Sequence, residues 1–193
     1  MLSGRFFMVW ESKMIRFGIL GAGRIGKVHT ATIGASKAAK VVYVADAMAK
    51  AASDLAATVG AKTASGEEII AAKDVDAILI ATPTGTHADL IEAASNAGKA
   101  ILCEKPVSLS VERILNCLKV VEKNKSNLMI GFNRRFDPNF GALEKRIRNG
   151  DIGTVELATI ISRDPAPPPV DYIKGSGGLY RDMMIHDFDL ARF

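Results

Sequence analysis

The chain has 193 residues, of which 48% are hydrophobic and 24% are charged, and this balance excludes an intrinsically disordered or collagen-like protein. Its 25 basic and 21 acidic residues are interspersed and leave a net charge of +4, which argues against a nucleic-acid partner. No apolar stretch approaches the roughly 18 residues needed to span a bilayer, so we expect no membrane partner either.

The N-terminus and the cysteines indicate a cytoplasmic protein. Residues 1–13 contain an apolar run that is too short for the core of a signal peptide, and they lack a small-residue cleavage site. We expect these residues to be an extension that is not part of the fold. Cys103 and Cys117 are too few to build a disulfide scaffold, and they lack the CxxC spacing of a zinc site or a redox pair. We therefore interpret them as reduced thiols.

From Ile15 onward, short apolar runs alternate with helix-forming stretches, as parallel βαβ units require. The runs are continuously apolar, which predicts strands buried on both faces of a parallel sheet. Ser65 and Glu68 form a capping-box pattern at the start of one intervening helix. We therefore expect an α/β fold with an open, doubly wound parallel sheet over residues 14–132. The predicted strands are Ile15–Leu20, Val41–Ala45, Ala77–Ala81, Ala100–Cys103 and Leu128–Phe132.

The pattern changes over residues 133–193. Asp137 and Pro138 predict the N-cap and first turn of a helix that ends near Asn149. A single strand has no partner in its own region and is not stable alone, so these residues are expected to be the N-terminal part of an incomplete second domain. The elements predicted after that helix are a strand over Thr154–Ser162, an irregular loop over 163–178 and a terminal helix from Leu179 to Phe193.

A glycine-rich turn, GAGRIG, lies between the first predicted strand and the following helix. In such a turn the first glycine permits the tight bend, the second admits a pyrophosphate and the third lets helix and strand pack closely. Asp46 ends the second strand, where a carboxylate can accept hydrogen bonds from ribose hydroxyls and repel a 2′-phosphate. A bare structural turn is the alternative, but the agreement of strand, turn, helix and acid favours an NAD site over NADP. The turn residues predicted to bind the cofactor are Gly21, Gly23, Arg24, Ile25 and Gly26.

Two other segments follow predicted strands at the same carboxyl edge, where open α/β sheets bind ligands. Thr82, Pro83 and Thr84 fit a cofactor site, although a simple strand end is an equally adequate local interpretation. Lys105 could be solvated surface; beside a nicotinamide, its ammonium could bind a substrate oxygen and favour loss of its proton.

The predicted terminal helix places Asp182, His186 and Asp189 on one face because they are four and three positions apart. An imidazole flanked by carboxylates is a suitable general base near neutral pH. A solvated acidic face is the alternative. His29, His87 and His186 are widely separated and lack HExxH spacing, so we expect no metal site.

Three separate signatures resemble the Gfo/Idh/MocA family of NAD(P)-dependent sugar and polyol dehydrogenases. They are FGILGAGRIGKVH (17–29), ILCEKP (101–106) and GGLYRDMMIHDFDLARF (177–193). Within the family, GFNRRFDPNF and TIISRDPAPPP are most similar to bacterial enzymes that oxidise myo-inositol at C2. The resemblance implies a Rossmann domain followed by an α/β domain with an open sheet, through which full-length members form homo-oligomers.

The resemblance also implies residue roles. Lys105, Asp182 and His186 match the catalytic residues: His186 would take the C2 hydroxyl proton, Asp182 would orient the imidazole and Lys105 would hold the oxygen. Hydride would pass to NAD, giving 2-keto-myo-inositol. The remaining residues implied to bind the cofactor are Thr82, Pro83, Thr84, His87, Glu104, Lys105 and Asn133, and those implied to bind substrate are Lys105, Asp164, Asp182, His186 and Asp189.

Family members continue through further strands after the IHDFD segment, so we expect this chain to be a fragment that binds NAD far better than it catalyses. Two alternatives remain. One is a dehydrogenase of another sugar or polyol, and the other is a non-catalytic NAD-sensing regulator. A sensor has no need to retain Lys105, Asp182 and His186 together.

Overall fold

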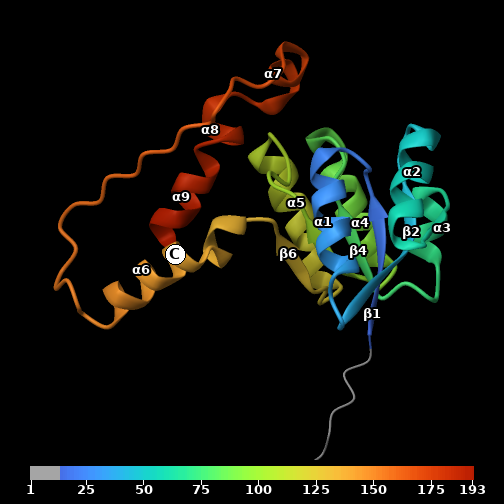
Figure 1. Ribbon diagram of the computed structural model, residues 1–193, viewed down its shortest axis with the longest axis horizontal. Helices are drawn as coiled ribbons and strands as arrows, with labels where there is room; N and C mark the ends of the chain where they lie inside the picture. The colour runs from blue at the N-terminus through green and yellow to red at the C-terminus, as the bar shows by residue number, and fades with distance from the viewer. Residues whose placement is uncertain (1–13) are drawn as a thin grey trace, which may run out of the picture.

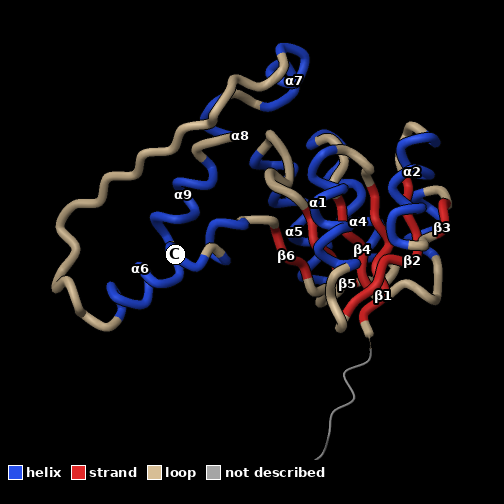
Figure 2. Tube along the Cα trace, in the orientation of Figure 1, coloured by secondary structure: helices blue, strands red, loops and turns tan. Residues whose placement is uncertain are grey.

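The computed structural model describes residues 14–193 (Figure 1). The predicted extension, residues 1–13, lies outside the described residues. The described chain has a sheet-containing part and a part made of helices and extended chain, and Figure 2 shows the strands confined to the first of these.

The sheet has six parallel strands in the order β3-β2-β1-β4-β5-β6. Strand order reverses beside β1, and the predicted doubly wound parallel sheet is therefore confirmed. The two-residue strand β3 was not predicted, because both of its side chains are exposed and carry no apolar signal. The strands are β1 (Ile15–Leu20), β2 (Ala39–Ala45), β3 (Lys62–Thr63), β4 (Ala77–Ile80), β5 (Ala100–Cys103) and β6 (Leu128–Ile130).

Helices cover both faces of the sheet. Ile78 and Ile80 pack in the cluster that includes α3, α4 and α5, whereas Leu79 packs in the cluster that includes α1 and α2. All three side chains are fully buried, which stabilises the sheet by about 1.5–3 kcal/mol each. The helices are α1 (Arg24–Gly34), α2 (Ala49–Val59), α3 (Gly66–Ala71), α4 (His87–Asn96) and α5 (Val111–Lys123), with a 3₁₀ turn η1 (Thr84–Thr86) before α4.

Local capping signals fix two helix starts as predicted. Ser65 accepts from the Glu68 N–H while the Glu68 carboxylate accepts from the Ser65 N–H, which completes a capping box on α3. Asp137 caps α6 by accepting from the N–H groups of Asn139 and Phe140. Elements after the sheet are a 3₁₀ turn η2 (Asn133–Phe136), α6 (Pro138–Arg148), α7 (Val170–Ser176), α8 (Leu179–Asp182) and α9 (Ile185–Arg192).

The strand predicted over Thr154–Ser162 is wrong. The structure has extended chain there, and its backbone makes no hydrogen bond to any other described backbone group. Leu157 is 86% exposed and Ile161 is 73% exposed. An alternating apolar pattern forms a strand only where a neighbouring strand supplies hydrogen bonds, and none is within reach here.

Two further predictions after residue 160 are wrong. The loop over 163–178 contains α7, because its prolines all precede Val170, where a missing N–H costs no helical bond, and Gly177 ends the helix at a φ of 81°. The single terminal helix is divided into α8 and α9 at Met183 and Met184, where the Met184 N–H reaches back to the Leu179 carbonyl.

Candidate active site

The glycine-rich turn packs against the carboxyl ends of the central strands. A Cβ atom on Gly21, whose φ is 104°, would lie 2.4 Å from the Ala81 carbonyl oxygen, and one on Gly26 would lie 2.0 Å from the Gly21 oxygen. A Cβ on Gly23 would meet no atom within 4 Å. The outer glycines therefore serve the fold, whereas Gly23 leaves open space over the turn.

The N-terminus of α1 opens onto that space. Gly23 is the N-cap and provides no side-chain cap. Within the described chain, the backbone N–H groups of Arg24, Ile25 and Gly26 meet no acceptor. Free N–H groups and the positive end of a helix dipole bind phosphate, so the turn fits the pyrophosphate of a dinucleotide.

Asp46 joins the glycine-rich turn to the end of β2. One carboxylate oxygen accepts from the Ala22 N–H at 2.7 Å and the other accepts from the Met48 N–H at 2.8 Å. Each carboxylate oxygen retains a second acceptor position. The half-buried Asp46 can therefore order the turn and still accept hydrogen bonds from ribose hydroxyls.

His87 joins two loops at the carboxyl edge. It is only 2% exposed, and its ring nitrogens lie 2.7 Å from the Pro106 oxygen and 2.8 Å from the Thr82 oxygen. Nearby, the Thr82 and Thr86 hydroxyls are 2.7 Å apart. The structure gives His87 a role in holding the loop that carries Lys105, and direct contact with a cofactor stays a prediction.

Lys105 is bound to Asp182, as the sequence led us to expect for residues of one site. Its Nζ donates to the Asp182 carbonyl oxygen at 2.6 Å and to Oδ1 at 3.0 Å. The Tyr172 hydroxyl donates to the same Oδ1 at 2.7 Å. The two charged side chains are mostly buried, with 15% of Lys105 and 23% of Asp182 exposed.

His186 lies beside this ion pair. Burial lowers the pKa of the imidazole below its ordinary value of 6.5, and the positive charges of Lys105 and Arg134 lower it further. Its Nδ1 is buried without a hydrogen-bond partner in the described chain, and its ring meets Phe132 edge-on. A neutral imidazole that lacks a partner can accept a proton.

Asp182 and His186 are not joined by a hydrogen bond within the described residues, although the carboxylate is close enough to raise the imidazole pKa. The break at Met183 and Met184 interrupts the helix that was predicted to place them on one face. The structure thus assigns the Asp182 carboxylate to Lys105 and Tyr172.

Glu104 contributes a contact that the sequence did not indicate. Its Oε1 lies 2.6 Å from the Nε2 of His29, a residue of α1 that sequence patterning indicated as structural. A Cβ on Gly131 would lie 3.1 Å from the Glu104 carboxylate oxygens, so that glycine leaves room for the acid. No local signal predicts this pair, because its partners are 75 positions apart and meet only in the folded chain.

Two arginines of η2 hold α9. Arg134 pairs with Asp187, whose Oδ1 also accepts from the Ser162 hydroxyl at 2.5 Å. Arg135 forms a two-pronged ion pair with Asp189 at 2.6 and 2.7 Å. Asp189, a predicted substrate ligand, is therefore already paired.

The other predicted residues of the second part are less engaged. Asn133 is exposed in η2. Asp164 is exposed on the extended chain before α7 and makes no hydrogen bond or ion pair with another described residue. The structure does not bring Asp164 to the other candidates.

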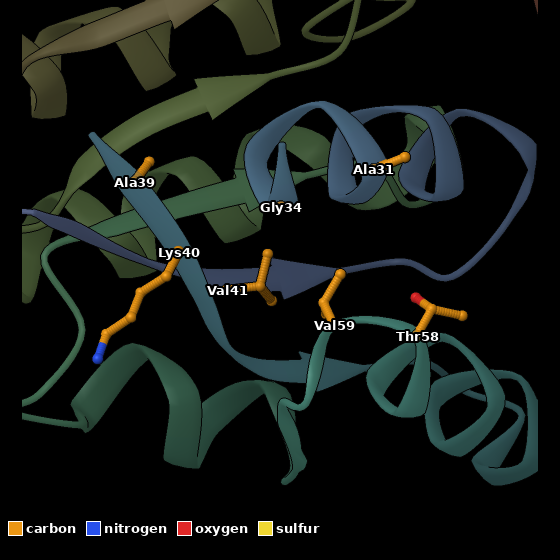
Figure 3. Close-up of a pocket in the computed structure, with 7 residues that line it drawn as sticks. All are labelled: Ala31, Gly34, Ala39, Lys40, Val41, Thr58 and Val59. Atoms are coloured by element: carbon orange, nitrogen blue, oxygen red, sulfur yellow. The ribbon is translucent and has the colours of Figure 1, made fainter. Parts of the chain in front are cut away.

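A separate hollow lies at the opposite edge of the sheet (Figure 3). It has a volume of about 330 Å³ and is lined by Ala31, Gly34, Ala39, Lys40, Val41, Thr58 and Val59. These residues start β2 and end α1 and α2, whereas the candidate residues follow the carboxyl ends of the strands. The hollow is not part of the candidate site.

Within residues 14–193, no group of three or more His, Cys, Asp or Glu side chains is placed to hold a metal ion. In the same residues, no helix is long and apolar enough to cross a membrane.

Known proteins resemble this chain along most of its length. It is 58% identical over 179 residues to "Inositol 2-dehydrogenase" of Rhizobium meliloti strain 1021, covering 93% of this chain and 54% of that protein. The crystal structure of a myo-inositol dehydrogenase from Corynebacterium glutamicum superposes with a TM-score of 0.88 at 47% identity, over 93% of this chain and 54% of that one. The chain therefore spans about half the length of these relatives.

A scyllo-inositol dehydrogenase from Lactobacillus casei was solved with NAD(H) and scyllo-inositol bound. It matches with a TM-score of 0.85 at 32% identity, over 93% of this chain and 56% of that one.

Two family models match the chain. Residues 15–132 match a model described as an oxidoreductase family with an NAD-binding Rossmann fold, and residues 140–193 match the GFO/IDH/MocA C-terminal domain. The first match covers more than half of the chain. The chain therefore belongs to the Gfo/Idh/MocA family of oxidoreductases, with an NAD-binding Rossmann fold as its sheet-containing part.

Proposed function

We propose that this chain carries the cofactor-binding and proton-transfer residues of an NAD-dependent inositol 2-dehydrogenase, which oxidises myo-inositol to 2-keto-myo-inositol. The observation that carries the proposal is the meeting of the Lys105–Asp182 ion pair with a histidine whose pKa is lowered. Lys105 follows β5 at the carboxyl edge of the sheet, onto which the glycine-rich turn also opens.

The residues would act on the C2 hydroxyl of the polyol. The Lys105 ammonium donates a hydrogen bond to the hydroxyl oxygen and stabilises the negative charge that develops on it. Neutral His186 accepts the proton. The glycine-rich turn and Asp46 would hold NAD, which would supply the hydride acceptor for C2 as the C–O single bond of the substrate becomes a carbonyl. Asp182 holds the Lys105 ammonium in place.

The choice of inositol as the proposed substrate rests on relatives whose names specify inositol. Oxidation of another polyol would use the same proton-transfer groups and is the second candidate. A non-catalytic NAD-sensing regulator is disfavoured because it has no use for a neutral, half-buried histidine beside a buried lysine.

We extend the proposal to the organisation of the protein. Residues 14–132 would form the cofactor-binding domain, and 133–193 the start of a substrate and oligomerisation domain in which Asn133, Asp164 and Asp189 contact ligands. The protein would act in the cytoplasm, in keeping with its buried free thiols, Cys103 and Cys117.

NADH absorbance with myo-inositol as substrate tests the function directly. We expect Lys105→Ala and His186→Ala to abolish NADH formation while calorimetric NAD binding persists. Lys99→Ala, which removes a lysine bound to carbonyl oxygens far from the site, is the control. The decisive measurement uses a protein extended to the full length of these relatives: if it binds NAD and turns over neither myo-inositol, scyllo-inositol nor another polyol, the enzyme is excluded and the regulator remains.

A further inference from the structure

One oxygen of Asp182 binds two side chains from different parts of the chain. Its Oδ1 accepts from the Lys105 ammonium at 3.0 Å and from the Tyr172 hydroxyl at 2.7 Å. Lys105 follows β5, Tyr172 belongs to α7 and Asp182 ends α8. The Tyr172 hydroxyl is thus a direct link from α7 to the groups proposed to transfer the proton.

The electrostatics of Tyr172 are consistent with a permanent donor. Partial withdrawal from water, followed by the nearby Asp182 carboxylate, raises the pKa of the Tyr172 phenol to about 12. The hydroxyl therefore keeps its proton at neutral pH and donates to Asp182. Arg24, the first residue of α1, is close enough to act on the same phenol in the opposite direction.

Packing alone does not account for this placement. The Tyr172 residue is 51% exposed, so its ring is not a core side chain. The end of α7 is held separately, where Gly177 lies against the Leu109 side chain and leaves no room for a Cβ. Tyr180, on α8, provides a comparison from the same region, because it is 68% exposed and its hydroxyl has no hydrogen-bond partner among the described residues.

We propose that Tyr172 is a positioning residue of the active site, whose hydroxyl holds the Asp182 carboxylate in the orientation that receives the Lys105 ammonium. A carboxylate held by two donors on one oxygen has little freedom to rotate, and Lys105 is thereby kept at a fixed point beside His186. The importance of this positioning for turnover rests on the function proposed above.

The first test follows the phenol itself in the complete chain. Tyrosine labelled with ¹³C at Cζ gives a separate NMR signal for each ring, and the Tyr172 signal is identified by its loss in Tyr172→Phe. We expect Asp182→Asn to lower the Tyr172 pKa, because the hydrogen bond and the negative charge that raise it are lost. An unchanged Tyr172 titration would overturn the proposal. Asp182→Asn retains the tyrosine, so Tyr172→Phe serves only to assign the signal and the pKa comparison itself is made between proteins that keep Tyr172.

The second test compares Tyr172→Phe with Tyr180→Phe. In Tyr172→Phe, the loss of a hydrogen bond to the charged Asp182 is expected to lower kcat about tenfold and to leave the KM for NAD unchanged. In Tyr172→Phe, limited acetylation followed by mass spectrometry is expected to show that Lys105 is modified several-fold faster than in the wild type, with the modification of Lys99 as the internal reference. Tyr180→Phe should match the wild type in both measurements.

The outcomes separate this inference from the proposed function. If a wild-type protein extended to the full length of the relatives forms no NADH with any polyol, the proposed function fails, and the Tyr172 titration together with the protection of Lys105 decides the positioning role. Wild-type kcat in Tyr172→Phe, or unchanged protection of Lys105, would refute that role.

Discussion

The charge state of His186 depends on its burial and on four charged neighbours rather than on its own position in the sequence. Burial makes the largest contribution to lowering its pKa, and the charges of Lys105 and Arg134 add to it. Glu104 and Asp182 raise the pKa and offset part of this effect. His186 therefore stays neutral to a lower pH than an ordinary histidine, whose pKa is 6.5, and this suits the general base proposed above.

We expect Lys105→Met to raise the pKa of His186, because the substitution removes a positive charge that disfavours the imidazolium. NMR titration of the histidine ring measures this directly. Lys99→Met, whose ammonium binds the Ala72 and Val75 carbonyls, should leave the titration unchanged. A His186 pKa that is insensitive to Lys105 would show that the two groups are not adjacent in solution.

The lowered pKa of His186 also predicts how stability depends on pH. Unfolded His186 binds its proton more tightly than folded His186, so the unfolded state gains protons first as pH falls. The free energy of unfolding should therefore decrease as pH drops from about 6.5 toward the folded pKa, and this loss should be smaller in His186→Gln. Urea unfolding of both proteins at several pH values would reveal the difference, and identical pH profiles would count against a buried neutral imidazole.

Asp46 orders the turn, since its two oxygens hold the Ala22 and Met48 N–H groups, and it is predicted to bind the cofactor as well. Asp46→Ala should weaken NAD binding about tenfold, because hydrogen bonds to a charged group are lost. It should also narrow the preference for NAD over NADP by removing a repelling charge. Calorimetry with both dinucleotides provides the measurement, and Asp54→Ala, at an exposed position on α2, is the control. An unaltered NAD affinity would remove Asp46 from the site.

At the scale of elements, different glycines of the glycine-rich turn serve the packing of the fold and the proposed binding of the cofactor. Gly26 allows α1 to approach β1, whereas Gly23 leaves the helix N-terminus uncovered. Neither role is visible in the GxGxxG pattern alone, because the pattern does not show which Cβ positions are obstructed.

We expect Gly26→Ala to lower the free energy of unfolding by about 2 kcal/mol, because the new methyl group would collide with the Gly21 carbonyl. Gly23→Ala should leave stability within about 0.5 kcal/mol and yet lower NAD affinity about tenfold or more, because its methyl group occupies the space over the turn. Thermal unfolding and calorimetry distinguish the two effects. Equal NAD affinity in Gly23→Ala and wild type would place the pyrophosphate elsewhere.

At the scale of the whole molecule, the two parts differ in how their backbones are satisfied. The sheet pairs its strands in register from β3 to β6. The extended chain from Thr154 to Pro168 makes no hydrogen bond with another described backbone group. The Lys105–Asp182 ion pair and the Phe132–His186 ring contact are among the contacts that hold the second part near the first. Within the second part, the Arg134–Asp187 and Arg135–Asp189 pairs hold α9 to η2.

Hydrogen exchange should reproduce this division. Amides of residues 154–169 are expected to exchange at the rate of an unstructured peptide, while those of β1 and β4 are strongly protected. Mass spectrometry of peptides from the two regions tests this. Concentration-dependent protection over residues 154–162 would instead show that this segment pairs with a second copy of the chain.

Local signals were sufficient for most of the Rossmann part. Continuous apolar runs predicted five strands of the sheet, and the Ser65 and Asp137 caps marked helix starts correctly. Such signals act over a few residues and do not need distant partners. The strand predicted over Thr154–Ser162 failed because a strand requires hydrogen bonds from another segment, which no local pattern reports.

The amino-acid sequence by itself determined the parallel sheet, the dinucleotide turn and the candidates Lys105, Asp182 and His186, because periodicity, glycine spacing and motif similarity are all properties of short segments. Only the tertiary structure decided that Asp182 binds Lys105 and Tyr172. It also decided that His87 is hydrogen-bonded to backbone carbonyls and that Glu104 is paired with His29. These pairings join residues far apart in the chain, and the burial that sets the His186 pKa exists only once the chain has folded.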